Sequence, residues 1–260
     1  MFPPPAQIEI PGLKTKTLGH PILHVEETES TQNLLRELFK NGAREGTLVL
    51  ADRQTRGRGR LGRSWSTIPG LQILASVLLV PNVPPAHLPF LSLAAGLAVA
   101  EALEFLGVPG TGLKWPNDVM VGGRKICGLL AEVVFQPGPA AVLLGMGLNV
   151  EGTAEELPVE LRETAVTVQM CMPSPCDHVR ILSLVLEALE ARLDHFQRGD
   201  TERLRLDYEK RWIQRGRTVN VDTGSDRITG TAEGIGADGS LLVRDSAGME
   251  RRISAGDVSV

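Results

Sequence analysis

Arginine and glycine are concentrated in one short stretch of the chain, residues 53–65, with the sequence RQTRGRGRLGRSW. It contains five arginines and three glycines in thirteen residues, within a chain whose formal net charge is −4. Arginine presents a planar, permanently charged fork that matches carboxylate or phosphate oxygens, and glycine lets the backbone approach a ligand closely. The run therefore predicts an ordered loop that binds an anion of the polyphosphate type.

Two other interpretations of this run are weaker. Gly57, Gly59 and Gly62 match the G-x-G-x-x-G pattern of dinucleotide-binding proteins, but that pattern opens a helix and precedes an acidic ribose ligand by roughly 20 residues. Here RSWSTIPG follows, a poor helix start, and no Asp or Glu occurs between Asp52 and Glu101. Flexible Arg/Gly segments that touch nucleic acid normally lie in longer low-complexity sequence, whereas strand-like apolar runs flank this loop.

Later motifs supply further candidates for chemistry. Lys114 ends a predicted strand just before the tight turn at 115–118, where it has either a directed role or simple solvation. Lys125 follows a Gly-Gly turn. In GMGLNV, residues 145–150, glycines interrupt an apolar strand, which predicts either a β-bulge or a close approach of the backbone to a ligand. Both alternatives remain open at the level of sequence.

The elements that position these residues are predicted from hydrophobic periodicity. ESTQNLLRELFKNG forms an amphipathic helix that begins at Ser30 or Thr31, whose side chains serve as an N-cap, as ligand contacts, or as both. Predicted strands at 46–52 and 71–80 flank the arginine loop. Further predictions are an apolar helix at about 88–106, an antiparallel meander from about 112 to 152, and helices at about 178–198 and 201–213. The predicted fold class is α+β, with a mixed or antiparallel sheet.

Composition changes at Gly216, and the rest of the chain shows short alternating strands with Gly/Asp turns, including an Asp238-Gly239 hairpin signal. We therefore predict a catalytic domain at 1–214 and a small C-terminal β-barrel at 215–260. At 260 residues with 42% hydrophobic content, the chain is long enough for one large and one small domain.

Charge and cysteine content exclude several classes of protein. The net charge of −4 argues against wholesale nucleic-acid binding. Cys127, Cys171 and Cys176 are too few and too scattered for a disulfide framework or structural zinc, which suits a reducing cytoplasm. The N-terminus lacks the features of a signal peptide, and the apolar run at 88–100 is shorter than the roughly 20 residues of a membrane span. A cytoplasmic protein without membrane contact is predicted.

The sequence strongly resembles biotin protein ligases. GRGRLGRSW (57–65), KWPND (114–118), RKICGLLAE (124–132) and GMGLNV (145–150) match that family's motifs in order, after ESTQ, and the resemblance covers roughly residues 22–260. It implies a class II synthetase-like catalytic domain followed by a small barrel. It also implies activation of biotin by ATP, with Mg²⁺, to biotinyl-5′-AMP and pyrophosphate, and transfer of biotin to a lysine of a biotin carboxyl carrier protein.

The resemblance also implies site residues. Ser30, Thr31 and Gln54 hold the biotin ureido ring and its surroundings, Lys114 contacts the carboxylate and the α-phosphate, and Asn149 lies near adenine and ribose. The arginine loop orders over the biotinyl and phosphate groups as a mobile lid, with Trp65 as a wall of the pocket. By this resemblance the catalytic residues are Lys114, Arg58 and Arg60, the further biotin contacts include Gly57 and Arg58, the nucleotide contacts are Arg60, Arg63 and Asn149, and no metal ligand is assigned.

The chain departs from the family's pattern at several points. Gln32 replaces a common Asn and is assigned no contact, and 150–176 contains no aromatic residue to stack on adenine. Asp118 either assists deprotonation of the carrier lysine or fixes its turn, and the turn is favoured. About thirty residues precede the Ser-Thr pair, so a DNA-binding domain is not expected, and a monofunctional monomer or homodimer is predicted. The alternatives are a lipoate-type ligase and a non-catalytic biotin-sensing regulator.

Overall fold

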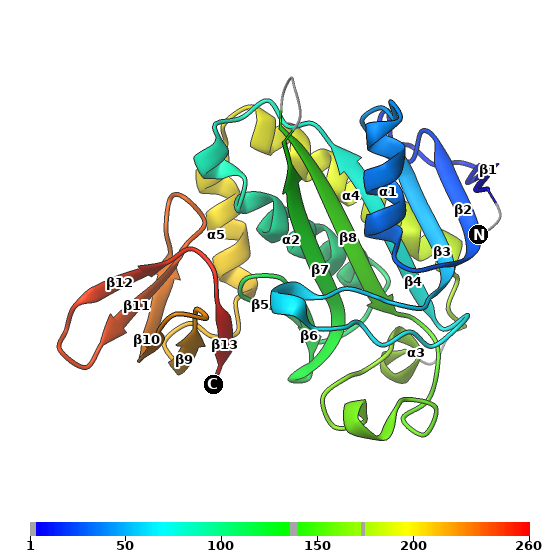
Figure 1. Cartoon of the computed structure of the whole chain (residues 1–260). Coiled ribbons are helices and arrows are strands. Elements are labelled where there is room, and N and C mark those ends of the chain that lie inside the picture. Colours follow the sequence, from blue (N-terminus) through cyan, green and yellow to red (C-terminus); the bar gives the residue numbers. More distant parts are fainter. Residues whose placement is uncertain (1–3, 136–139, 173–174) are drawn as a thin grey trace.

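Two β-sheets of different size organise the chain in the computed structural model, which describes residues 4–135, 140–172 and 175–260. The larger sheet has the order β1-β2-β3-β4-β8-β7-β6-β5, and the smaller has the order β12-β11-β10-β9-β13 (Figure 1). The strands of the larger sheet are β1 (Ala6–Ile8), β2 (Ile22–Thr28), β3 (Leu48–Gln54), β4 (Gln72–Leu79), β5 (Thr111–Lys114), β6 (Asp118–Val121), β7 (Arg124–Val134) and β8 (Ala141–Asn149).

The larger sheet is mixed, as predicted. Strands β2 and β3 run parallel and are joined through α1 (Thr31–Lys40), whereas the other neighbouring strands pair antiparallel. β4 is buried at every position, which explains its uninterrupted apolar sequence in the centre of a covered sheet. The predicted N-terminal arm contributes the edge strand β1, and the predicted meander corresponds to β5 through β8.

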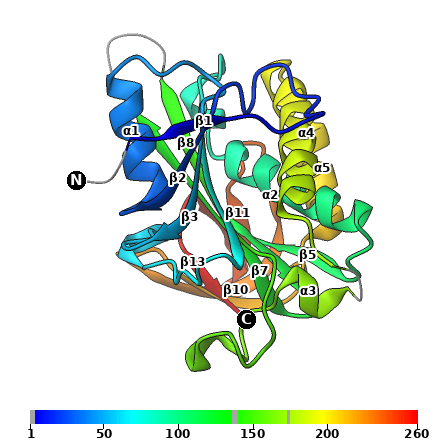
Figure 2. The same ribbon diagram turned by 90° about the vertical axis from the view of Figure 1, so that its right-hand side faces the viewer.

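Helices cover both faces of this sheet. α1 packs on one face through Leu35 and Phe39, which contact Val49 and Leu78. The other face carries α2 (Phe90–Phe105) together with α4 (His178–Gln197) and α5 (Thr201–Arg211) (Figure 2). Short helical segments complete this part of the chain: η1 (Arg60–Gly62), η2 (Pro85–His87), η3 (Val159–Leu161) and α3 (Val168–Cys171).

Helix α2 lies at the centre of the hydrophobic core. The segment Pro85–Phe105 is long and apolar enough to cross a membrane. Within the fold, however, α2 contacts α4, α5 and the strands of the larger sheet. A helix enclosed on all sides needs no polar face, which accounts for its composition.

The C-terminal residues form the predicted small β-domain, an antiparallel sheet of five strands. These are β9 (Thr218–Asp222), β10 (Arg227–Ile235), β11 (Leu241–Asp245), β12 (Glu250–Ile253) and β13 (Asp257–Ser259). Trp115 links the larger sheet to the small domain. Its side-chain Nε1 donates to the carbonyl of Gly239 at 3.0 Å, and its backbone N–H donates to Gln214 Oε1 at 2.7 Å. Helix α5 ends at Arg211, and Trp212 bridges to Leu113 in β5 instead of continuing the helix to 213.

Candidate functional site

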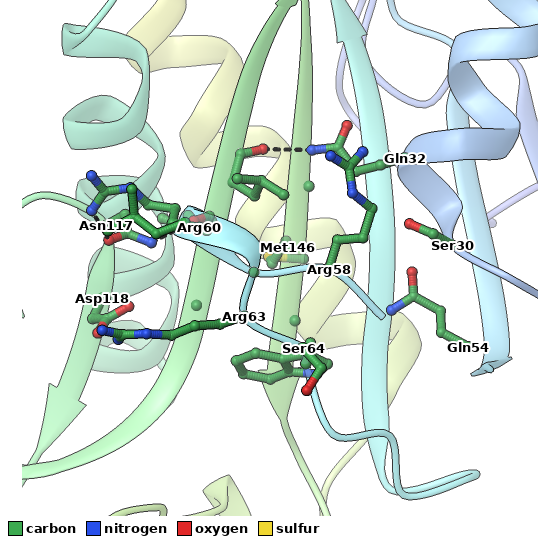
Figure 3. Close-up of a pocket in the computed structure, with 18 of the residues that line it drawn as sticks. Ser30, Gln32, Gln54, Arg58, Arg60, Arg63, Ser64, Asn117, Asp118 and Met146 are labelled. Carbon is green, nitrogen blue, oxygen red and sulfur yellow. Dashed lines mark hydrogen bonds between the residues drawn. The ribbon is translucent and has the colours of Figure 1, made fainter. Parts of the chain in front are cut away.

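A cavity of about 120 Å³ lies over β7 and β8, between the start of α1 and the arginine loop (Figure 3). Ser30 and Gln54 lie at one end, and Asn117 and Asp118 lie at the other. The structure brings together most of the residues that the sequence nominates: Ser30, Thr31, Gln54, Arg58, Arg60, Arg63 and Trp65 all line this cavity.

Ser30 occupies the N-cap position of α1 without capping the helix. Its backbone is extended, with φ −161° and ψ 134°, but its side chain makes no capping hydrogen bond. The Ser30 hydroxyl is buried and has no hydrogen-bond partner among the residues that the structure describes. Because buried hydroxyls are normally paired, this group is left for a ligand, and ligand contact is favoured over capping.

Thr31 fixes the orientation of the Gln54 amide. The backbone N–H and the hydroxyl of Thr31 both donate to Gln54 Oε1, at 2.8 and 3.0 Å. Gln54 Oε1 is therefore the acceptor, and its Nε2 amide is the group left to donate into the cavity. Thr31 acts through Gln54 and also contacts the Ser76 hydroxyl at 2.8 Å.

Glycines form the floor of the cavity beneath the indole of Trp65. A β-carbon at Gly147 would lie 2.4 Å from Trp65 Cε2, and one at Gly128 would lie 2.7 Å from Cζ3. The register of β8 is continuous with β4 from Val142 to Asn149 and with β7 from Ala141 to Leu148. The glycines of GMGLNV therefore do not mark a β-bulge; Trp65 approaches Gly147 closely and Gln32 approaches Gly145, and approach to a ligand stays a prediction.

Gly57 shapes the arginine loop instead of lining the cavity. The N–H of Trp65 donates to the Gly57 carbonyl at 2.9 Å, and a β-carbon at Gly57 would lie only 2.5 Å from the Trp65 carbonyl oxygen. Any side chain at Gly57 would separate the two ends of the loop. Gly57 is therefore required by the shape of the loop, and a contact of Gly57 with biotin stays a prediction.

Lys125, not Lys114, is the lysine of this cavity. The Lys125 ammonium lies 2.7 Å from Asp118 Oδ1 and 5.4 Å from the centre of the Trp65 ring. The sequence reading named Lys125 without assigning it a role. Strict alternation along β7 would place Lys125 and Gly128 on opposite faces, because they are three positions apart. The pairing of β6 with β7 shifts register between Val119 and Met120, and Lys125 lies on the same side as Gly128.

A second cavity, of about 420 Å³, adjoins the first and contains Lys114 and Asn149. The Asn149 side chain is engaged with the protein, because its Oδ1 accepts from Gln72 at 2.9 Å and its Nδ2 donates to the Val166 carbonyl at 3.3 Å. Asn149 therefore shapes the wall of this cavity. Four residues line both cavities and form the boundary between them: Ser64, Trp65, Asp118 and Lys125.

Each arginine of the loop has a protein partner. The pairs are Arg53 with Glu27 at 3.0 Å, Arg56 with Glu29 at 3.7 Å, Arg58 with Glu132 at 2.7 Å and Arg63 with Asp257 at 2.5 Å, while Arg60 donates to Asn117 at 3.1 Å and to the Gly256 carbonyl at 3.2 Å. Burial lowers the pKa of the Arg60 guanidinium, although Asp118 and Asp257 oppose that shift. Acidic and carbonyl partners therefore compensate the closely spaced positive charges of the loop.

The turn at 115–118 distributes three roles among neighbouring residues. Trp115 contacts the small domain through the Gly239 carbonyl. Asn117 Oδ1 accepts from Arg60, and its Nδ2 donates to the Leu129 carbonyl at 2.6 Å. Asp118 forms an ion pair with Lys125, and its role in the turn or in deprotonation of the carrier lysine stays a prediction.

Within the described part of the chain, no group of three or more His, Cys, Asp or Glu residues is placed to hold a metal ion. Cys127 is a buried free thiol whose pKa is raised by burial, and Cys171 and Cys176 are also free. A thiol with a raised pKa stays protonated and is a poor nucleophile.

Sequence comparisons identify the family. Residues 25–149 match the model of the biotin/lipoate A/B protein ligase family, and residues 216–260 match the biotin protein ligase C terminal domain. The biotin–[acetyl-CoA-carboxylase] ligase of Mycobacterium tuberculosis is 38% identical over 240 residues, which cover 90% of this chain and 86% of that protein. The chain belongs to the biotin protein ligase family.

Other ligases of the family share the sequence and the fold over most of this chain. The bifunctional ligase/repressor BirA of Bacillus subtilis is 32% identical over 94% of this chain and 75% of its own length. The biotin protein ligase of Aquifex aeolicus, solved in complex with biotin and ATP, superposes with a TM-score of 0.79 at 32% identity, covering 92% of this chain and 97% of that one. The predicted class II synthetase-like fold, followed by a separate small β-domain, is confirmed.

Proposed function

We infer that the protein is an ATP-dependent biotin protein ligase, which activates biotin as biotinyl-5′-AMP and then transfers it to a protein lysine. The observation that carries this function is the shared wall of Ser64, Trp65, Asp118 and Lys125 between two cavities. Two substrates bound on either side of that wall meet beside the Lys125 ammonium. The biotin protein ligase of Aquifex aeolicus, to which this chain is similar, was solved in complex with both biotin and ATP.

We assign biotin to the first cavity. The Ser30 hydroxyl and the Gln54 Nε2 are polar groups left for a ligand at the end opposite Asp118, and they suit the carbonyl and N–H groups of a ureido ring. The glycine floor and the Trp65 indole suit the apolar rings and chain of biotin. Lipoate lacks a ureido group, so these polar groups favour biotin over a lipoate-type substrate.

We assign ATP to the second cavity, which Lys114 and Asn149 line. In the first half-reaction a biotin carboxylate oxygen attacks the α-phosphorus of ATP, and pyrophosphate leaves. Both reactants are anions, so the protein must position them and compensate their charge. Lys125 at the shared wall and the guanidinium groups of Arg58 and Arg60 supply that charge. Lys114 is reassigned from the reacting carboxylate to the nucleotide side.

In the second half-reaction a neutral lysine amine of the carrier attacks the acyl carbon of biotinyl-5′-AMP. An amide forms, AMP leaves with the bonding electrons of the anhydride, and the amine loses a proton. We propose a biotin carboxyl carrier protein as the acceptor, because relatives are named for acetyl-CoA carboxylase. No covalent enzyme intermediate is required.

We propose that Mg²⁺ enters with ATP. Mg²⁺ is commonly held by one or two carboxylates together with substrate phosphates and water, and Asp118 is a carboxylate on the wall that both cavities share. The ion would neutralise phosphate charge during the displacement. Asp118 would then contact both the Lys125 ammonium and the Mg²⁺ ion or its bound water.

The decisive experiment mixes the purified protein with biotin, ATP, Mg²⁺ and a carrier domain, and follows the carrier's mass. A gain of one biotinyl group that needs both biotin and ATP is expected, and a carrier whose target lysine is replaced by arginine is the control. If the mass of the carrier does not increase, although another ligase modifies the same carrier, the proposal is refuted. Excess lipoic acid should not compete.

The net charge of −4 and the three free thiols support two further proposals. We propose that the protein does not bind operator DNA, which a gel-shift titration at low salt tests. We also propose that it works in a reducing compartment such as the cytoplasm.

A further inference from the structure

Glu132, near the end of β7, contacts the arginine loop through Arg58. Its carboxylate accepts two hydrogen bonds from Arg58, from Nη1 at 3.0 Å and from Nη2 at 2.7 Å. A second arginine, Arg36 of α1, donates to the same carboxylate at 2.9 Å. Asn33 of α1 also accepts from Arg58, at 3.2 Å. One carboxylate thus joins the loop to both β7 and α1.

The loop is tied down at its other end by different groups. Arg60 and Arg63 extend toward Asn117 and Asp118, whereas Arg58 extends the opposite way, toward Gln32 (Figure 3). Arg60 and Arg63 find their partners on the 115–118 turn and on the small domain. The pair of Arg58 with Glu132 therefore ties the middle of the loop to the α1 side of the cavity, whereas the contacts of Gln54 with Thr31 and of Arg56 with Glu29 hold only the start of the loop.

We propose that Glu132 is a positioning residue that closes the arginine loop over the ligand cavity by holding Arg58. The side chain of Glu132 is only 22% exposed and that of Arg58 is 39% exposed, so the pair is partly shielded from water. Two parallel N–H···O bonds fix the guanidinium plane as well as its position. Orientation of Arg58 toward a bound carboxylate or phosphate therefore depends on a residue that lines neither cavity.

Removal of the Glu132 charge has two consequences. The bidentate bonds are lost, and Arg36 and Arg58 become neighbouring cations without a shared anion, which repel each other. Because partly exposed pairs contribute on the order of 1 kcal/mol, the open population of the loop should rise about fivefold. The effect is local, since the contacts of Arg60 and Arg63 are unchanged.

Trypsin digestion can report opening of the loop, because trypsin cleaves after arginine. The loop between β3 and β4 contains four such sites, after Arg56, Arg58, Arg60 and Arg63. Limited digestion of the full chain without substrates, read by mass spectrometry at these four bonds, reports the open population when opening is fast. We expect Glu132→Gln to be cut about fivefold faster within the loop, with unchanged cleavage elsewhere and a Tm lower by no more than roughly 2–4 °C. Glu132→Asp should recover part of the protection.

Arg36→Met is the matched control, because it removes the other cation of Glu132 and leaves Arg58 paired. Its loop should be cut at the wild-type rate or more slowly. Equal acceleration in Glu132→Gln and Arg36→Met would overturn the proposal, as would wild-type cleavage in Glu132→Gln. A general loss of stability is recognised by faster cleavage outside the loop together with a lower Tm, and that result would also overturn it.

A second readout rests on the proposed function. Glu132→Gln should release preformed biotinyl-5′-AMP about fivefold faster than wild type, in a chase with unlabelled biotin. Faster release without faster loop cleavage would contradict the role of Glu132 in closing the loop. Failure of the wild type to form any adenylate would count against the ligase function alone, because the digestion requires no substrate.

Discussion

Replacement of Lys125 by methionine should abolish most of the adenylation activity, and replacement of Lys114 should not. Lys125 lies on the wall shared by both cavities, with its ammonium 2.7 Å from Asp118. Lys114 lines only the second cavity. Methionine keeps the apolar length of lysine and removes the charge, so the pair of variants compares two positive charges at different distances from the reacting atoms.

The expected magnitudes differ between catalysis and folding. Removing one preorganised group that stabilises transition-state charge typically lowers kcat by about 10²–10³-fold, and Lys125→Met should fall in that range. The ion pair with Asp118 is partly exposed, at 33% and 18%, so its loss should lower the free energy of unfolding by only about 1 kcal/mol. For a chain of this size that corresponds to a Tm lower by roughly 2–4 °C. Lys114→Met should raise the KM for ATP about tenfold or less.

Biotin-dependent exchange of labelled pyrophosphate into ATP isolates the first half-reaction, and thermal melts of each variant accompany it. Full saturation curves for biotin and ATP separate kcat from KM. The assignment of Lys125 is refuted if Lys114→Met loses as much kcat as Lys125→Met does. It is also refuted if Lys125→Met keeps more than about a tenth of the wild-type kcat, a loss too small for a group at the reacting centre.

Three further predictions concern the cavity and the core. Ser30→Ala should leave stability almost unchanged, because its hydroxyl does not cap α1, but should raise the KM for biotin about tenfold in steady-state assays, the loss expected for one buried hydrogen bond. Gly147→Ala should weaken biotin binding at least about tenfold by calorimetry, because its β-carbon and the Trp65 indole would overlap. Glu190 accepts backbone N–H groups of residues 16–18, so Glu190→Gln should lower the free energy of unfolding at pH 7 by roughly 1 kcal/mol in urea titrations.

The Glu190 prediction also has a definite pH dependence. Burial raises the pKa of Glu190, but the backbone N–H groups of Leu18, Lys16 and Thr17 outweigh it and hold the pKa below its ordinary value. A lowered native pKa gives stability that is fully present above the unfolded pKa of about 4.3 and is lost as the pH falls through the native value. The difference between wild type and Glu190→Gln should therefore shrink below about pH 4, and a constant difference down to pH 2 would contradict this.

Contradictory outcomes for the other two variants are equally specific. A large drop in the Tm of Ser30→Ala would show that the hydroxyl supports the helix after all. Normal biotin affinity in Gly147→Ala would show that the Trp65 indole can move away from residue 147 without weakening biotin binding.

Most of the secondary structure was predictable because hydrophobic periodicity reports burial. The number of buried faces sets the sequence pattern of an element. β4 and α2 are buried almost throughout and are apolar, whereas α1 is buried on one face and is amphipathic. Ends of elements were less predictable. The helix predicted to reach 213 stops at Arg211, since Trp212 pairs with Leu113 in a distant strand.

The order of residues along the chain specified which side chains are available: the closely spaced arginines of 53–65, the polar Ser30 and Thr31, and the glycines that permit close approach. Tertiary structure alone decided which of these face one another. Arg58 and Glu132 are 74 positions apart, and Arg63 and Asp257 are 194 apart. Lys114 and Lys125 both flank tight turns in sequence, but β-sheet register directs only Lys125 to the shared wall. Periodicity along one strand reveals its faces, whereas the partner of a charged side chain depends on which distant strand or loop folds against it.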